Sequence, residues 1–213
     1  MIEGPVVHQF TAVLSGRDAV GHHTLALDRL LRELGAVTTI YAAHVNPESK
    51  DWATHYRHHA EDAPADWIIY QASTGTPVAD YLLERPEPLV VNYHNMTPSE
   101  FFYPWEPHVG TELDHGRRQL ASLCARARLG IADSEFNARD LRAAGVGWVE
   151  VAPVLVDDSV LPSGDVPSSF GSGSKVTLLF VGRLAPNKCQ QDLISALVVL
   201  RCWHDDVELV LLG

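Results

Sequence analysis

The sequence predicts an α/β fold built on a doubly wound, parallel sheet, and three observations support this prediction. Short apolar runs alternate with helical patterns along most of the chain, which is the order that repeated β-α-β units produce. The apolar runs are nearly continuous in hydrophobic residues, as strands are when helices cover both faces of a sheet. The 213 residues, 46% of them hydrophobic, also suffice to bury a large core without disulfide bridges.

The first part of the chain holds alternating strands and helices. Strands are expected at residues 6–14, 37–43, 66–70, 88–95, 129–133 and 148–153, and helices at residues 20–34, 77–84, 109–128 and 135–144. Leu27, Leu30, Leu31 and Leu34 recur at helical spacing, and Gly35 follows where a left-handed residue commonly ends a helix. Together these elements predict one Rossmann-like domain over residues 1–155.

A second unit follows a change in composition. Residues 156–174 are rich in Asp, Pro, Gly and Ser, which is typical of a linker. The pattern then restarts with a strand at 176–181, a loop at 182–188, a helix at 190–203 and a strand at 207–212. Residues 175–213 are therefore expected to be the first β-α-β unit of a second Rossmann-like domain. Such a unit cannot cover both faces of its own strands, so we expect the chain to be the first part of a longer protein.

Composition excludes several classes of function. The formal charge of −11 argues against nonspecific binding to nucleic acid, because DNA and RNA attract positive charge. Cys124, Cys189 and Cys202 are too few and too scattered for a disulfide framework or a zinc site, and they indicate a reducing compartment. No secretory signal and no apolar run of about 18 residues is visible. A cytoplasmic location is therefore predicted.

Three loops carry residues that suit ligand binding. In the turn after the first strand, Gly16 and Gly21 would let a ligand approach the backbone at a helix N-terminus, although such glycines also serve simply to make the turn. At the end of the fourth strand stands Tyr93-His94-Asn95-Met96-Thr97-Pro98, where His94 could donate to a sugar hydroxyl or only cap the strand. After the linker, Arg183 and Lys188 precede a helix, an arrangement that suits a diphosphate and equally fits two solvated cations.

With these loops and the segment Ala132-Asp133-Ser134-Glu135-Phe136-Asn137, the chain resembles the retaining GT-B glycosyltransferases, the large family that builds polysaccharides and glycolipids. The resemblance covers essentially the whole chain. The Gly182-Arg183-Leu184…Lys188 element, just after a linker, is its most specific part. The stretch from Tyr93 to Phe102 is similar to bacterial members that assemble surface polysaccharides.

The resemblance implies two facing Rossmann-like halves, with a glycan or lipid-linked acceptor on the first half and a nucleotide-sugar donor on the second. Arg183 and Lys188 would neutralise the donor diphosphate, and Gly16 would approach the same phosphates. His94 would be the catalytic-site residue that contacts the transferred sugar or orders the reacting groups. Gly21, Asn95, Ser134 and Trp105 are candidates for the acceptor cleft. Transfer with retention, no metal and no cofactor beyond the nucleotide-sugar co-substrate are expected.

Two departures from the family pattern limit this expectation. No pair of Glu residues separated by seven residues occurs in the chain, and Cys189 stands where glycine commonly follows the motif lysine. The 213 residues alone are therefore expected to be catalytically inert without the remainder of the C-terminal domain. Two alternatives are open: a nucleotide-sugar epimerase on the same scaffold, and a non-catalytic binding or interaction module.

Other features suggest weaker hypotheses. His55, His58 and His59 have a spacing that can bind a metal, but histidines facing solvent are the favoured interpretation. The basic residues of the helix at 109–128 suggest a peripheral contact with the inner membrane. The competing interpretation is that they only form a solvated face of the helix. Trp67 and Trp148 are expected in the core, because both belong to predicted strands.

Overall fold

The computed structural model describes residues 4–61, 64–156 and 176–213, and its larger part is a parallel sheet of seven strands. The strands are β1 (Val6–Val13), β2 (Val37–His44), β3 (Thr54–His55), β4 (Trp67–Ala72), β5 (Leu89–Tyr93), β6 (Leu129–Ala132) and β7 (Val149–Val151). Their spatial order is β3-β2-β1-β4-β5-β6-β7. The chain thus builds outward from β1 in one direction and then returns to build in the other. In open sheets of this kind, ligands bind beyond the carboxyl ends of the strands at that reversal.

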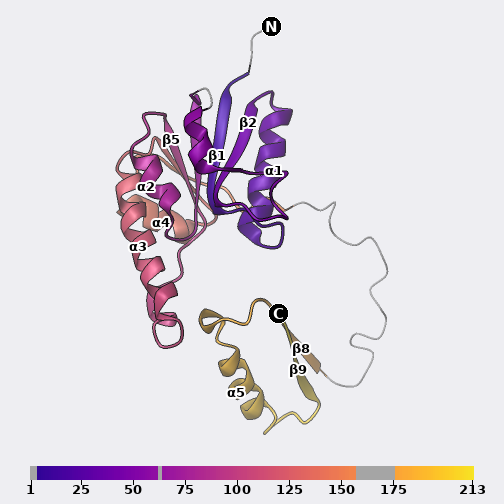
Figure 1. Cartoon of the computed structure of the whole chain (residues 1–213). Coiled ribbons are helices and arrows are strands. Elements are labelled where there is room, and N and C mark those ends of the chain that lie inside the picture. The colour runs from indigo at the N-terminus through magenta and orange to yellow at the C-terminus, as the bar shows by residue number, and fades with distance from the viewer. Residues whose placement is uncertain (1–3, 62–63, 157–175) are drawn as a thin grey trace.

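Helices cover both faces of this sheet, as the continuous apolar strands require. The helices are α1 (Ala19–Glu33), α2 (Pro77–Leu83), α3 (Pro107–Cys124) and α4 (Glu135–Ala143), with short 3-10 turns η1 (Tyr56–Glu61) and η2 (Ser99–Phe101). Figure 1 shows α1 on one side of the sheet and α2, α3 and α4 on the other. The larger core cluster lies under the second group, where Leu82, Leu123 and Leu141 meet the aromatic side chains of the strands. The predicted doubly wound class is confirmed.

Capping side chains and one glycine set the ends of the helices. Asp18 accepts a hydrogen bond from the backbone N–H of Gly21 at 2.8 Å and begins α1. Thr76 and Ser134 cap α2 and α4 in the same way. After α1, Gly35 has a φ of 90°, so the predicted end of this helix is confirmed.

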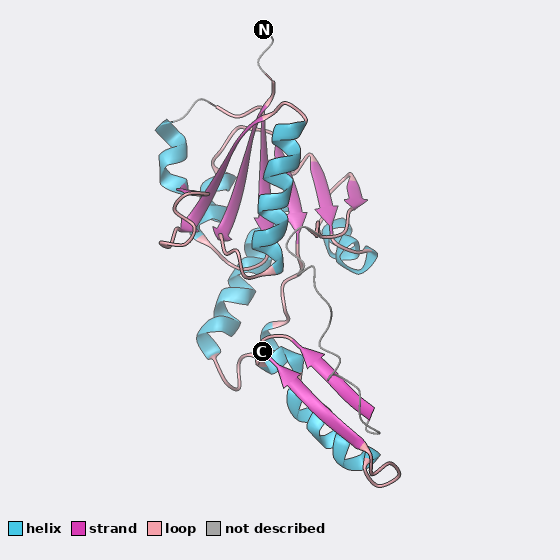
Figure 2. Cartoon of the chain, turned by 90° about the vertical axis from the view of Figure 1, so that its right-hand side faces the viewer, coloured by secondary structure: helices cyan, strands magenta, loops and turns pink. Residues whose placement is uncertain are grey.

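A separate two-stranded parallel sheet forms the C-terminal unit, which is drawn in ochre to yellow in Figure 1. It consists of β8 (Val176–Val181), the 3-10 turn η4 (Pro186–Lys188), α5 (Gln190–Leu200) and β9 (Val207–Leu212), and Figure 2 shows α5 packed along one face of the two strands. Many large apolar side chains of this unit are exposed; they include Leu179, Val181, Ile194, Val198 and Trp203. The predicted linker lies almost entirely outside the described residues.

Several expectations about individual elements need correction. Strand β3 was not expected, because two residues carry no periodic signal. The helix predicted at 109–128 begins at Pro107 and ends at Cys124. Trp67 and Trp148 are exposed, since Trp67 is the first residue of β4 and Trp148 directly precedes β7, so neither lies in the buried middle of a strand. His59 is buried and not solvent-facing: its ring lies 2.9 Å from both the Tyr81 hydroxyl and His8 Nδ1.

Candidate functional site

Polar side chains gather at the carboxyl ends of β4, β5 and β6, next to the point where the strand order reverses. His94 follows β5 directly, and its imidazole is 2% exposed. Its Nε2 lies 2.7 Å from Oε1 of Gln71, and its Nδ1 lies 3.0 and 3.1 Å from the two carboxylate oxygens of Asp133. Asp133 follows β6 and is 18% exposed. Both ring nitrogens of His94 are therefore already partnered within the protein.

A row of amides continues this network through the sheet. Gln71 Nε2 donates to Gln9 Oε1 at 2.9 Å, and Gln9 Nε2 donates to the Thr24 carbonyl at 3.1 Å. Asn92 Nδ2 donates to Gln71 Oε1 at 3.0 Å, while Asn92 Oδ1 is buried without a hydrogen-bond partner among the described residues. The three amides are buried in strands, where each needs hydrogen-bond partners to offset the cost of leaving water.

A second histidine, His23 of α1, completes the cluster. Its ring lies edge-on to that of His94, with 5.1 Å between the centroids. The backbone N–H of Leu155 donates to His23 Nδ1 at 3.0 Å, and Asn92 Nδ2 lies 2.8 Å from His23 Nε2. Burial, and then the neighbouring His94, lower the pKa of His23 to about 4, against an opposing effect of Asp133. His23 is therefore neutral at physiological pH.

The two glycines of the first turn have different surroundings. A Cβ on Gly21 would lie 1.6 Å from the Ser15 carbonyl oxygen, so close packing of the turn requires glycine there. A Cβ on Gly16 would meet only the indole of Trp52, at an ordinary 3.5 Å. Close contacts within the protein thus explain why position 21 is glycine. They do not explain the glycine at position 16, where a ligand could approach the backbone.

The remaining cleft candidates lie on separate loops. Asn95, directly after His94, is exposed and has a φ of 65°, a left-handed conformation uncommon for residues other than glycine. Ser134 accepts from the Asn137 backbone N–H at 3.2 Å and so begins α4. Trp105 is 74% exposed, in the loop between η2 and α3.

A pocket of about 460 Å³ opens at the carboxyl ends of β1 and β2. Backbone and side chains of residues 74–77 form one wall, where Gly75 packs so tightly against α3 that a Cβ would lie 2.4 Å from the Glu112 carbonyl oxygen. Charged and titratable side chains line the rest of the pocket; they are His44, Asp80, Glu112 and His115. Gly21, Asn95, Ser134 and Trp105 do not contribute to the lining.

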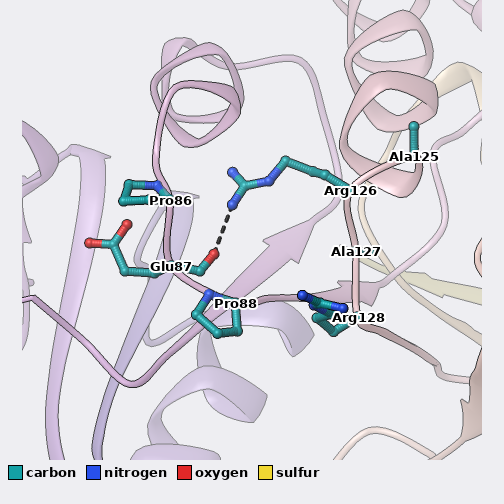
Figure 3. A pocket seen from close by; sticks show the side chains of 7 residues that line it. All are labelled: Pro86, Glu87, Pro88, Ala125, Arg126, Ala127 and Arg128. Carbon is teal, nitrogen blue, oxygen red and sulfur yellow. Dashed lines mark hydrogen bonds between the residues drawn. The ribbon is translucent and has the colours of Figure 1, made fainter.

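A second hollow, of about 330 Å³, lies at the opposite end of the sheet, before β5 and β6 (Figure 3). Arg126 crosses it and donates to the Glu87 carbonyl at 2.7 Å, while Arg85 pairs with the Glu87 carboxylate. Arg126 is thus engaged inside the protein, which removes it from the basic surface proposed for membrane contact. Because this hollow lies at the amino ends of the strands, we assign no ligand to it.

In the C-terminal unit, Arg183 and Lys188 flank the loop between β8 and α5, and both are exposed. Gln190 Nε2 donates to the Arg183 carbonyl at 2.8 Å, which holds the loop against the start of α5. Cys189 has a φ of 50°, and this explains why glycine suits its position. Asn187, between the two cations, donates to Thr97 Oγ1 at 3.5 Å and links this loop to the one that follows His94.

Within residues 4–61, 64–156 and 176–213, no group of three or more His, Cys, Asp or Glu side chains could hold a metal ion. In the same part of the chain, none of the helices has both the length and the apolar character needed to span a membrane.

Comparison with known proteins identifies the fold. No protein-family model and no curated protein matches the sequence. The glycotransferase of kitacinnamycin superposes with a TM-score of 0.55 at 14% identity, over 99% of this chain and 66% of that one. The chain has a GT-B-type fold. A putative UDP-N-acetylglucosamine 2-epimerase from Listeria monocytogenes superposes with a TM-score of 0.53 at 11% identity, over 98% of this chain and 62% of that one. S. aureus MnaA in complex with UDP superposes with a TM-score of 0.51 at 13% identity, over 98% of this chain and 61% of that one.

These GT-B-type neighbours extend well beyond the matched region, since the chain spans only 61–66% of their length. At 11–14% identity they establish the fold but assign no residue roles. The site contains two residues that the sequence analysis did not name as site candidates: Gln71 and Asp133. Gln71, in β4, and Asp133, directly after β6, contact His94 from 23 and 39 residues away in the chain. Their positions at strand ends were the available signal, because such ends converge in a parallel sheet.

Proposed function

We propose that this chain is the acceptor-binding part, with the opening of the donor-binding part, of a GT-B glycosyltransferase that transfers a sugar from a nucleotide-sugar to a glycan or glycolipid. The supporting observation is the contact between Asn187 and Thr97. It brings the loop that carries Arg183 and Lys188 beside the loop that follows His94. The proposal therefore places the two cations beside the polar carboxyl edge of the first sheet.

In this proposal the donor diphosphate binds Arg183 and Lys188 and approaches Gly16, whose missing side chain leaves room for it. Two cations and the N-terminus of α5 stabilise the negative charge that grows on the leaving diphosphate. The same groups would serve a transfer that retains the anomeric configuration and needs no metal ion.

The acceptor is assigned to the pocket of about 460 Å³ beside α2 and α3. Asp80 and Glu112 line this pocket with carboxylates, which accept hydrogen bonds from sugar hydroxyls and repel anionic groups. We therefore place the hydroxyl-bearing end of an acceptor there.

A nucleotide-sugar epimerase is the second candidate, because two of the three solved neighbours carry epimerase-related names or bind UDP. One experiment separates the two. The protein, expressed with any coding sequence that follows residue 213 in its gene, is incubated with a UDP-sugar with and without a glycan acceptor, and the products are identified by NMR and mass spectrometry.

A new glycoside formed only with acceptor, with the donor's anomeric configuration, supports the transferase. Inversion of a ring carbon without acceptor supports the epimerase. If neither product forms but the protein binds some ligand tightly, the result would favour a non-catalytic module. Arg183→Ala and Lys188→Ala should each reduce turnover, and Arg201→Ala, a substitution of an exposed arginine after α5, serves as the matched control.

A further inference from the structure

The two neighbouring histidines of the site have opposite surroundings. His23 faces two donors, the backbone N–H of Leu155 and the amide of Asn92. His94 faces Gln71 on one side and the carboxylate of Asp133 on the other. A proton shared between these two rings is therefore stabilised on His94 and not on His23.

The row of amides fixes which atom of Gln71 meets His94. The backbone carbonyl of Thr24 can only accept, so the group 3.1 Å from it is Nε2 of Gln9. Oε1 of Gln9 must then accept from Nε2 of Gln71, at 2.9 Å. This leaves Oε1 of Gln71 to face His94 Nε2, which must carry a proton in order to donate to it.

The other ring nitrogen meets an acceptor as well. His94 Nδ1 lies within 3.1 Å of both carboxylate oxygens of Asp133, so a hydrogen bond there also requires a proton, on the nitrogen or on the acid. Imidazole is a stronger base than a carboxylate, and Asp133 keeps some contact with solvent, which favours a charged carboxylate. The charged and titratable groups that face His94 are Asp133, from the loop after β6, and the neutral His23, from α1.

We propose that His94 is a buried imidazolium that holds the Asp133 carboxylate in place, and that Asp133 is the group that accepts a hydrogen bond from a hydroxyl of the bound sugar. His94 is then a positioning residue, because its side chain is 2% exposed and both ring nitrogens are occupied, whereas Asp133 is 18% exposed at the ligand-binding edge. The charge state of His94 follows from the protein alone. The ligand contact of Asp133 rests on the proposed function.

The charge state is tested by NMR of the 15N-labelled chain at neutral pH. Both ring nitrogens of His94, assigned by the loss of their signals in His94→Gln, should show protonated-type chemical shifts. In Asp133→Asn, His94 should lose one proton at the same pH. A native His94 with one unprotonated nitrogen at neutral pH would overturn the proposal, whatever the function of the protein.

The ligand contact is tested on the protein expressed with any coding sequence that follows residue 213 in its gene, with UDP-glucose and its monodeoxy derivatives as probes. Asp133→Asn should weaken UDP-glucose binding about tenfold or more, and should have no effect on the derivative that lacks the contacted hydroxyl. Asp51→Asn, an exposed aspartate, is the control and should leave both affinities unchanged. Equal affinity of the native chain and Asp133→Asn for every probe would refute the contact while leaving the proposed function intact. No binding of UDP-glucose by that extended protein with native Asp133 would count against the proposed function, while the nitrogen shifts would still decide the charge state.

Discussion

At the scale of single residues, the unusual feature is a set of three buried amides in a largely apolar sheet. Gln9, Gln71 and Asn92 are at most 1% exposed, in strands whose neighbours are Val, Ile and Tyr. A buried amide without partners costs roughly 1–3 kcal/mol, so apolar residues would give a more stable sheet. Here the amides connect the backbone of α1 to His94, and we infer that they are retained to fix the orientation of that ring.

His23 gives the first prediction, a dependence of stability on pH. Its pKa is about 4 in the folded chain and near 6.5 when unfolded, so the unfolded chain binds more protons between these values. The free energy of unfolding should therefore fall as the pH drops from about 6.5 to about 4, by at most about 2–3 kcal/mol. Urea unfolding at both pH values should show a smaller fall for His23→Gln than for the native chain. His22→Gln, at the exposed neighbouring position, should behave like the native chain.

The glycines of the first turn give the second prediction. Gly21→Ala should destabilise the chain by about 2–4 kcal/mol or prevent folding, because its Cβ would collide with the Ser15 carbonyl. Gly16→Ala should stay within about 0.5 kcal/mol of the native stability, since its Cβ meets only Trp52 at a normal distance. If Gly16→Ala binds UDP-glucose as well as the native chain does, Gly16 has no role at the donor phosphates.

At the scale of the elements, each strand end and helix start near the site has a local cause. The loop after β6 shows this well: Asp133 follows the strand and reaches His94, and the next residue, Ser134, begins α4 by capping it. Of two adjacent side chains, one thus contacts His94 and the other starts a helix.

The cap at Ser134 leads to the third prediction. Ser134→Ala should lower the free energy of unfolding by about 1 kcal/mol, because the Asn137 N–H loses its acceptor, and Ser134→Asp should restore it. The measurement is a urea titration of the three chains. A loss of ligand affinity in Ser134→Ala without a loss of stability would instead place Ser134 in the cleft, as the sequence suggested.

The elements also show how far the sequence alone could lead. Strands such as β4 and β5 were predictable because uninterrupted Ile, Val and Leu leave few alternatives. Strand β3 was not, since Thr54 and His55 are held by pairing with β2 and not by their own propensity. The place of His94 at the end of a buried strand was predictable. Its partners were not, because whether a distant Gln or Asp reaches the ring depends on the register of three strands.

At the scale of the whole molecule, the seven-stranded part and the C-terminal unit differ in how completely their apolar side chains are buried. The seven-stranded sheet is enclosed by helices, whereas β8, β9 and α5 expose apolar side chains on several sides. Exposed apolar surface of this kind favours contact with further protein. The first part can therefore stand alone more readily than the second.

The fourth prediction concerns self-association of the chain. Val198, on α5, is 64% exposed, and Val198→Lys should reduce the fraction of dimers and larger species seen by sedimentation velocity. Gln191→Lys adds the same charge at an exposed polar position of the same helix and should reduce association less. Equal effects of the two substitutions would mean that net charge, and not the apolar surface of α5, controls association.

The strand order has a consequence for how the protein is made. The central strand β1 leaves the ribosome first, and β2, β4, β5, β6 and β7 can each join an open edge of the growing sheet in the order of their synthesis. None of the described strands has to be inserted between two that are already paired, since β3 also joins an open edge, beside β2. During this assembly the side-chain carbonyl of Gln9 gains its hydrogen-bond partner only when Gln71 of β4, 62 residues later, has been synthesised. In a nascent chain halted after β2, water should therefore reach the centre of the sheet, and that centre should exclude water only once β4 has emerged.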